Sequence, residues 1–492
     1  MILKYKFNNT TLTTSPTELH YSILSDDTNE FSRTLSKFKK SLKKTELEEK
    51  LCQRDQYGNT ALHLAVMTGN LEATRLLLES DSRVKIRNEQ FWTPLHEAIS
   101  LGNKEMVKIL YSKFIKEVKN EFENSVPLIK ISLKEMLDFY VEIKWDFETW
   151  IPFVSRFLPS DVCKVYKYGT KIRIDTTLED VARAAHNTDN SNGEQSGFSP
   201  LNWKRGDLSF IVDIRQEKNK SSIVFLDNNK KTYVRIDPRK NEDEEMDEET
   251  LSKEIEFLLS NEIAHVKLDT SAAEFALMET GWLSKKPKID FVNGYLSTFY
   301  DIKNLYVVSK VRLEHLSAEE LKKKEMEHKK FLEYLGGKSQ EQVFELSNDT
   351  KKDSTDSLVS IGSKTESSNQ PRLITWDEYM NHSVDNCPTF GRKLKLKENR
   401  KEFKAQIAMS DEFPLNVTEL NNLLEALAPL GKFRRLKEFI DLKLPSGFPV
   451  KIDIPIVATV SAKVCFQNFK RDFKFDPNFF SIPPSYEQIQ VE

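Results

Sequence analysis

The chain has 492 residues, of which 39% are hydrophobic and 30% are charged. Its 73 lysines and arginines nearly balance its 76 aspartates and glutamates, which leaves a formal net charge of -3. This balance argues against a protein that coats nucleic acid with its whole surface. At roughly 150 residues per domain, the length predicts about three domains.

The four cysteines are scattered and form no C-x-x-C pair, which excludes a disulfide framework and a zinc ribbon. Residues 1–10 are not followed by an apolar core of signal-peptide length. No apolar stretch reaches the eighteen or so residues that would span a bilayer. We therefore expect a cytoplasmic protein that contacts a membrane only peripherally.

A repeat of 33 residues stands near the beginning of the chain. Residues 55–65 recur as residues 88–98, with threonine, leucine, histidine and alanine at matching positions, and Gly69-Asn70 recurs as Gly102-Asn103. This period and pattern resemble the ankyrin repeat, a β-turn followed by two antiparallel helices. The clear units are about 55–87 and 88–120. We expect second helices over 71–79 and 104–114.

Two repeats bury too little apolar surface alone, so capping units are expected beside them. His20 and Ile23 are spaced like His63 and Val66, but 43 residues earlier. We therefore predict a degenerate cap over 16–50, with about ten extra residues near 39–50, inside a repeat region spanning 16–130. The repeated histidines are interpreted as hydrogen-bonded structural residues rather than metal ligands.

The remainder of the chain changes to the two-residue period of β-strands. Residues 141–148 alternate strictly between apolar and charged side chains, which predicts a strand with one buried face. Similar patterns cover 171–175, 222–226, 232–236, 403–409, 450–456 and 460–466. We predict an α+β multidomain chain: helical ankyrin repeats followed by a mixed, mainly antiparallel β domain with helices. Capping signals predict helices over 317–335 and from 416.

The β domain is expected in two parts, 131–335 and 371–485. Residues 336–370 are polar and predict a flexible linker or loop. Residues 187–199 predict a loop insertion, and the acidic run 242–249 predicts a solvated loop, with docking to a basic partner as the alternative. The basic run 392–401 fits an exposed strand or loop edge or, alternatively, a contact with anionic lipid.

Motifs for catalysis are missing from the sequence. It contains no GxxxxGK[ST], GxGxxG, HExxH or GxSxG pattern, and its eight histidines show no metal-ligand spacing. We therefore predict that the protein is not an enzyme, with no catalytic residues, no cofactor and no metal site.

Six short segments carry a closer resemblance. They are LPSDVCKVYK (158–167), RGDLSF (205–210), TGW (280–282), TWDEY (375–379), IAMSDEFPL (407–415) and GFPVKIDIP (447–455). Their order behind two ankyrin repeats resembles the ankyrin repeat domain-containing protein 13 family over roughly residues 16–485. Many members carry ubiquitin-interacting motifs, but this sequence shows none and is most similar to the family's C-type branch.

The resemblance implies a chaperone for newly made G-protein-coupled receptors, peripheral on the cytosolic face of the endoplasmic reticulum. Because no ATP-binding motif is present, such a chaperone would hold its client without a driven cycle. A general scaffold that links soluble partners and a lipid-binding module are the alternatives.

The turn tips of the repeats are the predicted partner-binding surface. Repeat proteins bind through such tips, and aromatic residues dominate interface energetics. We therefore predict that Tyr57, Asn59, Phe91 and Trp92 contact a partner. The alternative is that the aromatic side chains pack against the neighbouring repeat.

Overall fold

The computed structural model describes most of the chain. The described residues are 18–25, 29–149, 158, 160–178, 205–213, 222–236, 248–281, 284–324, 326, 358–361, 372, 374–382, 388–390, 392–427, 434–457, 460–471, 475–476 and 478–489. The predicted insertion 187–199, positions 242–247 of the acidic run, and positions 336–357 and 362–370 of the predicted linker lie outside them.

The first seven helices form three stacked pairs with one extra helix. They are α1 (Glu18–Leu24), α2 (Glu30–Ser41), α3 (Lys44–Cys52), α4 (Ala61–Met67), α5 (Leu71–Glu79), α6 (Pro94–Leu101) and α7 (Lys104–Glu135). The stretch predicted as extra residues before the first clear repeat forms α3. Thr93 caps α6 by accepting a hydrogen bond from the backbone N–H of His96.

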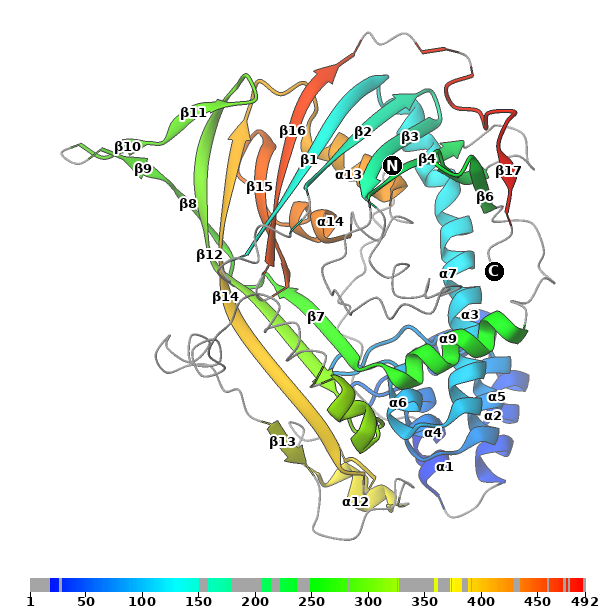
Figure 1. Cartoon of the computed structure of the whole chain (residues 1–492). Helices are drawn as coiled ribbons and strands as arrows, with labels where there is room; N and C mark the ends of the chain where they lie inside the picture. The colour runs from blue at the N-terminus through cyan, green and yellow to red at the C-terminus, as the bar shows by residue number, and fades with distance from the viewer. Residues whose placement is uncertain are drawn as a thin grey trace.

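Helix α7 is much longer than the predicted 104–114, because it serves two cores. Its first turns bury Met106, Val107 and Leu110 against the other repeats. Its last turns bury Ile129 and Leu133 in the core of the sheet. The helix therefore joins the two parts of the molecule without a break (Figure 1).

In the described residues after α7, fifteen strands form one large sheet. Its path runs β11-β12-β14-β15-β16-β1-β2-β3-β4-β5-β6-β17, with β7 and β8 also pairing with β12 and β13 with β14. Every pairing between its strands is antiparallel except β17 with β6, so the predicted α+β class is confirmed. The strands are β1 (Phe139–Thr149), β2 (Ser160–Tyr168), β3 (Lys171–Leu178), β4 (Arg205–Asp213), β5 (Ser222–Asp227), β6 (Thr232–Ile236), β7 (Ile263–Asp269), β8 (Glu274–Leu277), β11 (Ile289–Val292), β12 (Tyr295–Arg312), β13 (Leu358–Ile361), β14 (Leu394–Ser410), β15 (Phe448–Val457), β16 (Val460–Lys470) and β17 (Glu487–Gln488).

Four further helices and a small hairpin complete the described elements considered below. The helices are α9 (Glu248–Ser260), α12 (Trp376–Met380), α13 (Val417–Ala426) and α14 (Arg434–Ile440), and the hairpin pairs β9 (Glu279–Thr280) with β10 (Lys286–Pro287). Asn416 and Glu419 form the predicted capping box of α13. At the start of the predicted helix over 317–335, Ser317 and Glu320 exchange the two capping hydrogen bonds. Residues 325 and 327–335 of this range lie outside the described residues.

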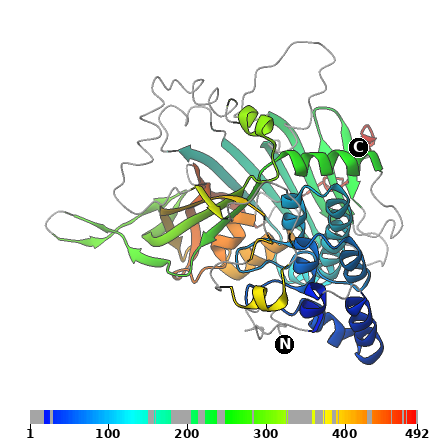
Figure 2. The same ribbon diagram turned by 90° about the horizontal axis from the view of Figure 1, so that it is seen from below.

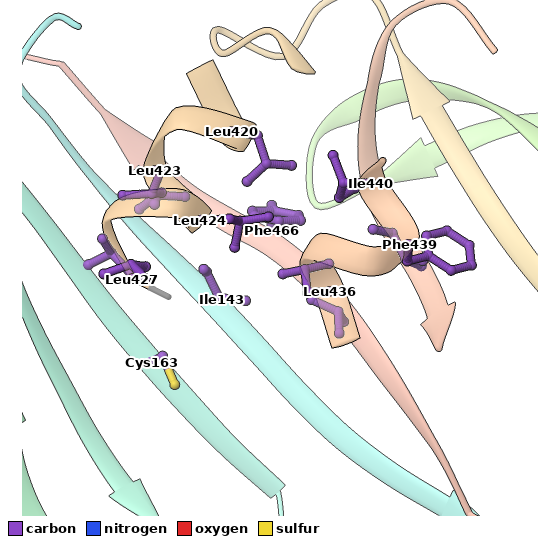
Figure 3. Packing of buried hydrophobic residues seen from close by; sticks show 14 of the residues in the cluster. Ile143, Cys163, Leu420, Leu423, Leu424, Leu427, Leu436, Phe439, Ile440 and Phe466 are labelled. Atoms are coloured by element: carbon purple, nitrogen blue, oxygen red, sulfur yellow. The ribbon is translucent and has the colours of Figure 1, made fainter. Parts of the chain in front are cut away.

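Helices α13 and α14 cover one face of the sheet (Figure 3). Leucines on one side of α13, among them Leu420, Leu423 and Leu424, pack with Phe439 of α14 onto strand residues such as Phe466. The 3.6-residue spacing of these leucines gives α13 the single apolar stripe that this packing requires. These residues belong to one cluster of buried hydrophobic side chains between the two helices and the sheet.

The structure corrects two predictions for the β domain. Only part of the basic run 392–401 is an exposed edge: Leu396 and Lys397 pair with β12 on one side and with β13 on the other, whereas residues 398–400 are exposed and, among the described strands, pair only with β12. The predicted linker 336–370 contains strand β13, which supplies that second pairing. Among the helices of the described residues, none is long and apolar enough to cross a bilayer.

Candidate partner-binding site

The first predicted turn tip is covered by the chain's own C-terminal part. Tyr57 and Asn59 are 2% and 0% exposed. The Tyr57 hydroxyl donates to the carbonyl oxygen of Tyr379 at 2.8 Å, and the two rings meet edge to face with centroids 5.1 Å apart. The Asn59 side-chain amide donates to the Tyr379 hydroxyl at 3.0 Å. Helix α12 therefore occupies the place that we predicted for a partner.

A buried carboxylate organises this contact. Asp55 accepts hydrogen bonds from the backbone N–H groups of Tyr57 and Asn59 at 2.8 and 2.9 Å and from the Tyr379 hydroxyl at 2.5 Å. Burial raises the pKa of the Asp55 carboxyl to about 6, although these hydrogen bonds favour its ionised form. The turn is thus shaped by Asp55 and closed by Tyr379.

The second turn tip lies against strands β7 and β12. Phe91 has a left-handed backbone (φ 72°), and its half-buried ring stacks on His265 with centroids 5.1 Å apart, while the amine of Lys267 lies 4.7 Å from the ring. Trp92 is 2% exposed, and the Arg312 guanidinium lies 5.2 Å from its ring. The exposure that we expected at Tyr57, Asn59 and Trp92 is therefore wrong.

An ion cluster lies behind the second tip, where α6 meets β12. The Glu97 carboxylate binds the guanidinium groups of Arg312 at 2.8 Å and of Arg392 at 3.1 Å, and Arg312 also binds Glu314 at 2.7 Å. Burial raises the pKa of Glu97, but the two guanidinium groups more than offset it and hold the pKa at about 2. Arg392, predicted as part of an exposed basic run, is instead buried in this cluster.

The repeat histidines are hydrogen-bonded, as predicted. The Nδ1 atom of His63 accepts from the backbone N–H of Thr60 at 3.1 Å, so the proton is on Nε2, which lies 3.1 Å from the carbonyl oxygen of Trp92. His20 makes the equivalent contact with the carbonyl oxygen of Asn59 at 3.0 Å. Each histidine therefore joins one repeat to the next turn. The described residues contain no group of three or more side chains placed to hold a metal ion.

An open surface remains at the other end of the β domain, where two of the quoted motifs meet. The segment from Ser410 to Glu419, which links β14 to α13, lies beside Gly447 and Phe448 at the start of β15. Together with Leu137 and Arg471 they line a hollow of about 430 Å³. Gly447 has φ +98°, and a Cβ atom there would lie 2.9 Å from the backbone of Ser410. Glycine is therefore required for this close approach.

Aromatic rings form the floor of this hollow, and carboxylates lie at its rim. Phe413 stacks on Phe448 with centroids 4.1 Å apart, and both rings are buried. Asp411 and Glu419 line the hollow, whereas the Glu412 carboxylate accepts a hydrogen bond from the backbone N–H of Leu296 on β12. The Arg471 guanidinium is bound to the carbonyl oxygen of Pro414. The hollow thus combines an aromatic floor with a rim of two carboxylates, which suits a ligand that is both apolar and basic.

The motifs that form this hollow indicate family membership in the sequence but no binding role. The signal that could have identified the hollow is the pair SDEFP and SGFP, in which acids or glycine flank a phenylalanine and a proline.

The ANKRD13 C-terminal family model matches residues 173–486, and a model of three ankyrin repeats matches residues 9–121. The chain is 40% identical over 438 residues to human ankyrin repeat domain-containing protein 13C, covering 89% of this chain and 73% of that protein. The chain belongs to the ankyrin repeat domain-containing protein 13 family.

Within the family, the two branches differ in their similarity to this chain. Protein 13C-B of Xenopus laevis is also 40% identical over 438 residues, which cover 89% of this chain and 77% of that protein. Mouse protein 13B is 30% identical over 434 residues, covering 85% of this chain and 63% of the relative. The similarity to the C-type branch predicted from the motifs is confirmed, and ankyrin repeats imply a role in protein binding.

Proposed function

We propose that this family member is a non-enzymatic, ATP-independent chaperone and adaptor. It binds cytosolic segments of newly made G-protein-coupled receptors at the cytosolic face of the endoplasmic reticulum and controls their biogenesis and exit. The family role implied by the motifs supports this proposal. The rim of carboxylates around the Phe413 hollow is the structural observation that carries it.

The chemistry of the client matches that rim. Loops of membrane proteins on the cytosolic side carry an excess of lysine and arginine and lie next to apolar spans. A segment of this kind can place an apolar side chain against Phe413 and Phe448 while its basic residues approach Asp411 and Glu419. Such binding needs no nucleotide, because the client is held and then released by competition with its own folding.

The test is binding of labelled peptides that copy the cytosolic loops and tail of a receptor, measured by fluorescence anisotropy. Asp411→Asn combined with Glu419→Gln removes two carboxylates of the rim and is expected to weaken binding roughly tenfold at low salt. Glu425→Gln is the matched control, because Glu425 is exposed on the same helix but does not line the hollow. Equal affinity of the double variant and the control would remove the hollow from the mechanism.

The rival is a general scaffold that links soluble partners. Cell fractionation separates the two proposals: the chaperone is expected with the reticulum fraction and is released from it by an alkaline carbonate wash, as a peripheral protein is. A protein found wholly in the soluble fraction would favour the scaffold.

A further inference from the structure

We propose that the arm formed by β8, β9, β10 and β11 is a membrane-docking element that inserts an apolar face into the headgroup region of an anionic phospholipid bilayer. Figures 1 and 2 show β9 and β10 extending outward beyond the edge of the large sheet. The inference deepens the membrane contact of the proposed function and rests on that proposal for the identity of the membrane.

The strand register places four large apolar side chains on one face of this arm and of the adjoining end of β12. Leu277 is paired with Tyr300, Ile289 with Thr298, and Phe291 with Leu296. Directly paired residues share a face, and so do residues two apart in one strand. Because positions 296, 298 and 300 of β12 share one face, their partners Phe291, Ile289 and Leu277 lie on that same face. The apolar arm face is 43% exposed at Leu277, 54% at Ile289, 66% at Phe291 and 42% at Leu296.

The arm is held rigidly to the sheet. The backbone N–H of Lys288 donates to the carbonyl oxygen of Met278 at 2.7 Å, that of Met278 to the oxygen of Phe299 at 2.9 Å, and that of Phe299 to the oxygen of Lys288 at 3.0 Å. At the base of β12, the N–H of Leu296 donates to the Glu412 carboxylate at 3.0 Å. The exposed side chains are thus presented by fixed backbone.

Charge favours a lipid surface as the occupant. The whole arm, residues 274–292, contains three lysines and three acids, but they are not spread evenly. Lys285, Lys286 and Lys288 lie in and beside β10 with one acid, Glu279, which pairs with Lys285 at 3.7 Å. Glu274 and Asp290 lie where the arm pairs with β12, so the outer part of the arm is basic. Apolar side chains beside lysines match the boundary between acyl chains and anionic headgroups. In addition, β9 and β10 project from the body, so these strands can meet a bilayer before the rest of the described molecule does. A protein ligand fits better at the hollow, which is concave and acidic.

The experiment is flotation of the purified full chain with vesicles of phosphatidylcholine alone or mixed with phosphatidylserine. The chain is expected to float with the mixed vesicles and much less with the neutral ones. Ile289→Ser combined with Phe291→Ser should lower the partition coefficient roughly tenfold or more, and Lys285→Gln with Lys286→Gln also by roughly tenfold or more. Thermal melting of each variant verifies its fold, which changes at exposed positions should preserve.

Ile131→Ser is the matched control, since Ile131 is 53% exposed and belongs to α7, a helix that lies on the other side of the molecule from β9 and β10 in Figure 1. It should float as the unchanged chain does. Failure of the unchanged chain to float with any vesicle, or normal flotation of the Ile289/Phe291 variant, would overturn the inference. If that variant instead lost receptor peptides, the arm would be a protein contact. Vesicles contain no receptor, so this result is independent of whether the proposed client is correct.

Discussion

Replacing Glu97 with glutamine should lower the stability of the contact between the repeats and the β domain. Glu97 lies on α6, and both guanidinium groups that it binds come from the C-terminal part: Arg312 from β12 and Arg392 from the segment before β14. The side chains of Glu97 and Arg312 are 4% and 1% exposed. Glutamine keeps the shape and one hydrogen-bond acceptor but removes the charge. Two buried cations are then left with Glu314 as the remaining carboxylate of the described cluster.

The magnitude can be obtained in two ways. A carboxyl whose pKa falls from its ordinary value of 4.5 to about 2 is stabilised in its ionised form by about 3 kcal/mol. Independently, removing one partner of a buried ion pair typically costs about 3–5 kcal/mol. Both estimates place the loss for Glu97→Gln near 3 kcal/mol. Because the Glu97 pKa is lowered, its contribution is present above about pH 4.5 and disappears as the pH falls toward 2.

Urea denaturation at pH 7, followed by tryptophan fluorescence and by far-ultraviolet circular dichroism, measures this loss. The expected result is a lower midpoint for the variant or a division into two transitions, because the cluster links two parts that have separate cores. Glu105→Gln is the control: Glu105 pairs with Arg75, but both side chains are about half exposed, and such pairs contribute about 0–1 kcal/mol. A Glu97 variant as stable as the control would refute the conclusion that this ion cluster stabilises the contact between the two parts.

Two further predictions concern acid and backbone geometry. Burial lowers the pKa of the three repeat histidines, His20, His63 and His96, to about 4, 4 and 3, so between about pH 6.5 and 4 the unfolded chain binds three protons that the folded chain does not. Because the raised pKa of Asp55 lets the folded chain bind one proton that the unfolded chain does not, the net difference is two protons. The free energy of unfolding should therefore fall by about 3 kcal/mol for each pH unit of acidification. Urea titrations at several pH values measure this slope, and a flat profile would contradict buried neutral rings. Gly447→Ala should lower the free energy of unfolding by about 1–3 kcal/mol and weaken peptide binding at the hollow, because the φ of +98° and the nearby backbone of Ser410 leave no room for a methyl group. A variant with unchanged melting temperature and peptide affinity would contradict this prediction.

The features that the sequence predicted correctly are those encoded by neighbours along the chain. The 33-residue period located α4, α5 and the start of α6 because each repeat has its own cap and its own apolar stripe. Alternation located β1 and the two strands β5 and β6, which pair antiparallel. Strand β7 was not predicted, because its burial alternates poorly and its residues include exposed and half-exposed polar side chains.

The prediction that the turn tips are exposed is wrong because residues far away in the sequence bury them. A tyrosine at a repeat turn has the same neighbours whether it faces solvent or another part of the chain. What buries Tyr57 is Tyr379, which lies 322 positions later, and nothing near either residue indicates that they meet. Similarly, the residues near Glu97 in the sequence indicate an exposed glutamate on an amphipathic helix. Its burial depends on Arg312 and Arg392, which lie far away in the sequence.

These long-range contacts change where a client can bind. In many repeat proteins the turn tips are free to receive ligands. Here both tips are covered by α12, β7 and β12, through rings and a carboxylate whose hydrogen bonds are made within the chain. Opening them for a client would expose Tyr379 and leave Asp55 with fewer donors, which costs free energy that a weakly held client does not supply. The repeats are therefore a fixed support for the sheet. This agrees with the proposed function, in which a client binds at the acidic hollow around Phe413 and the apolar arm beside it is left for the membrane.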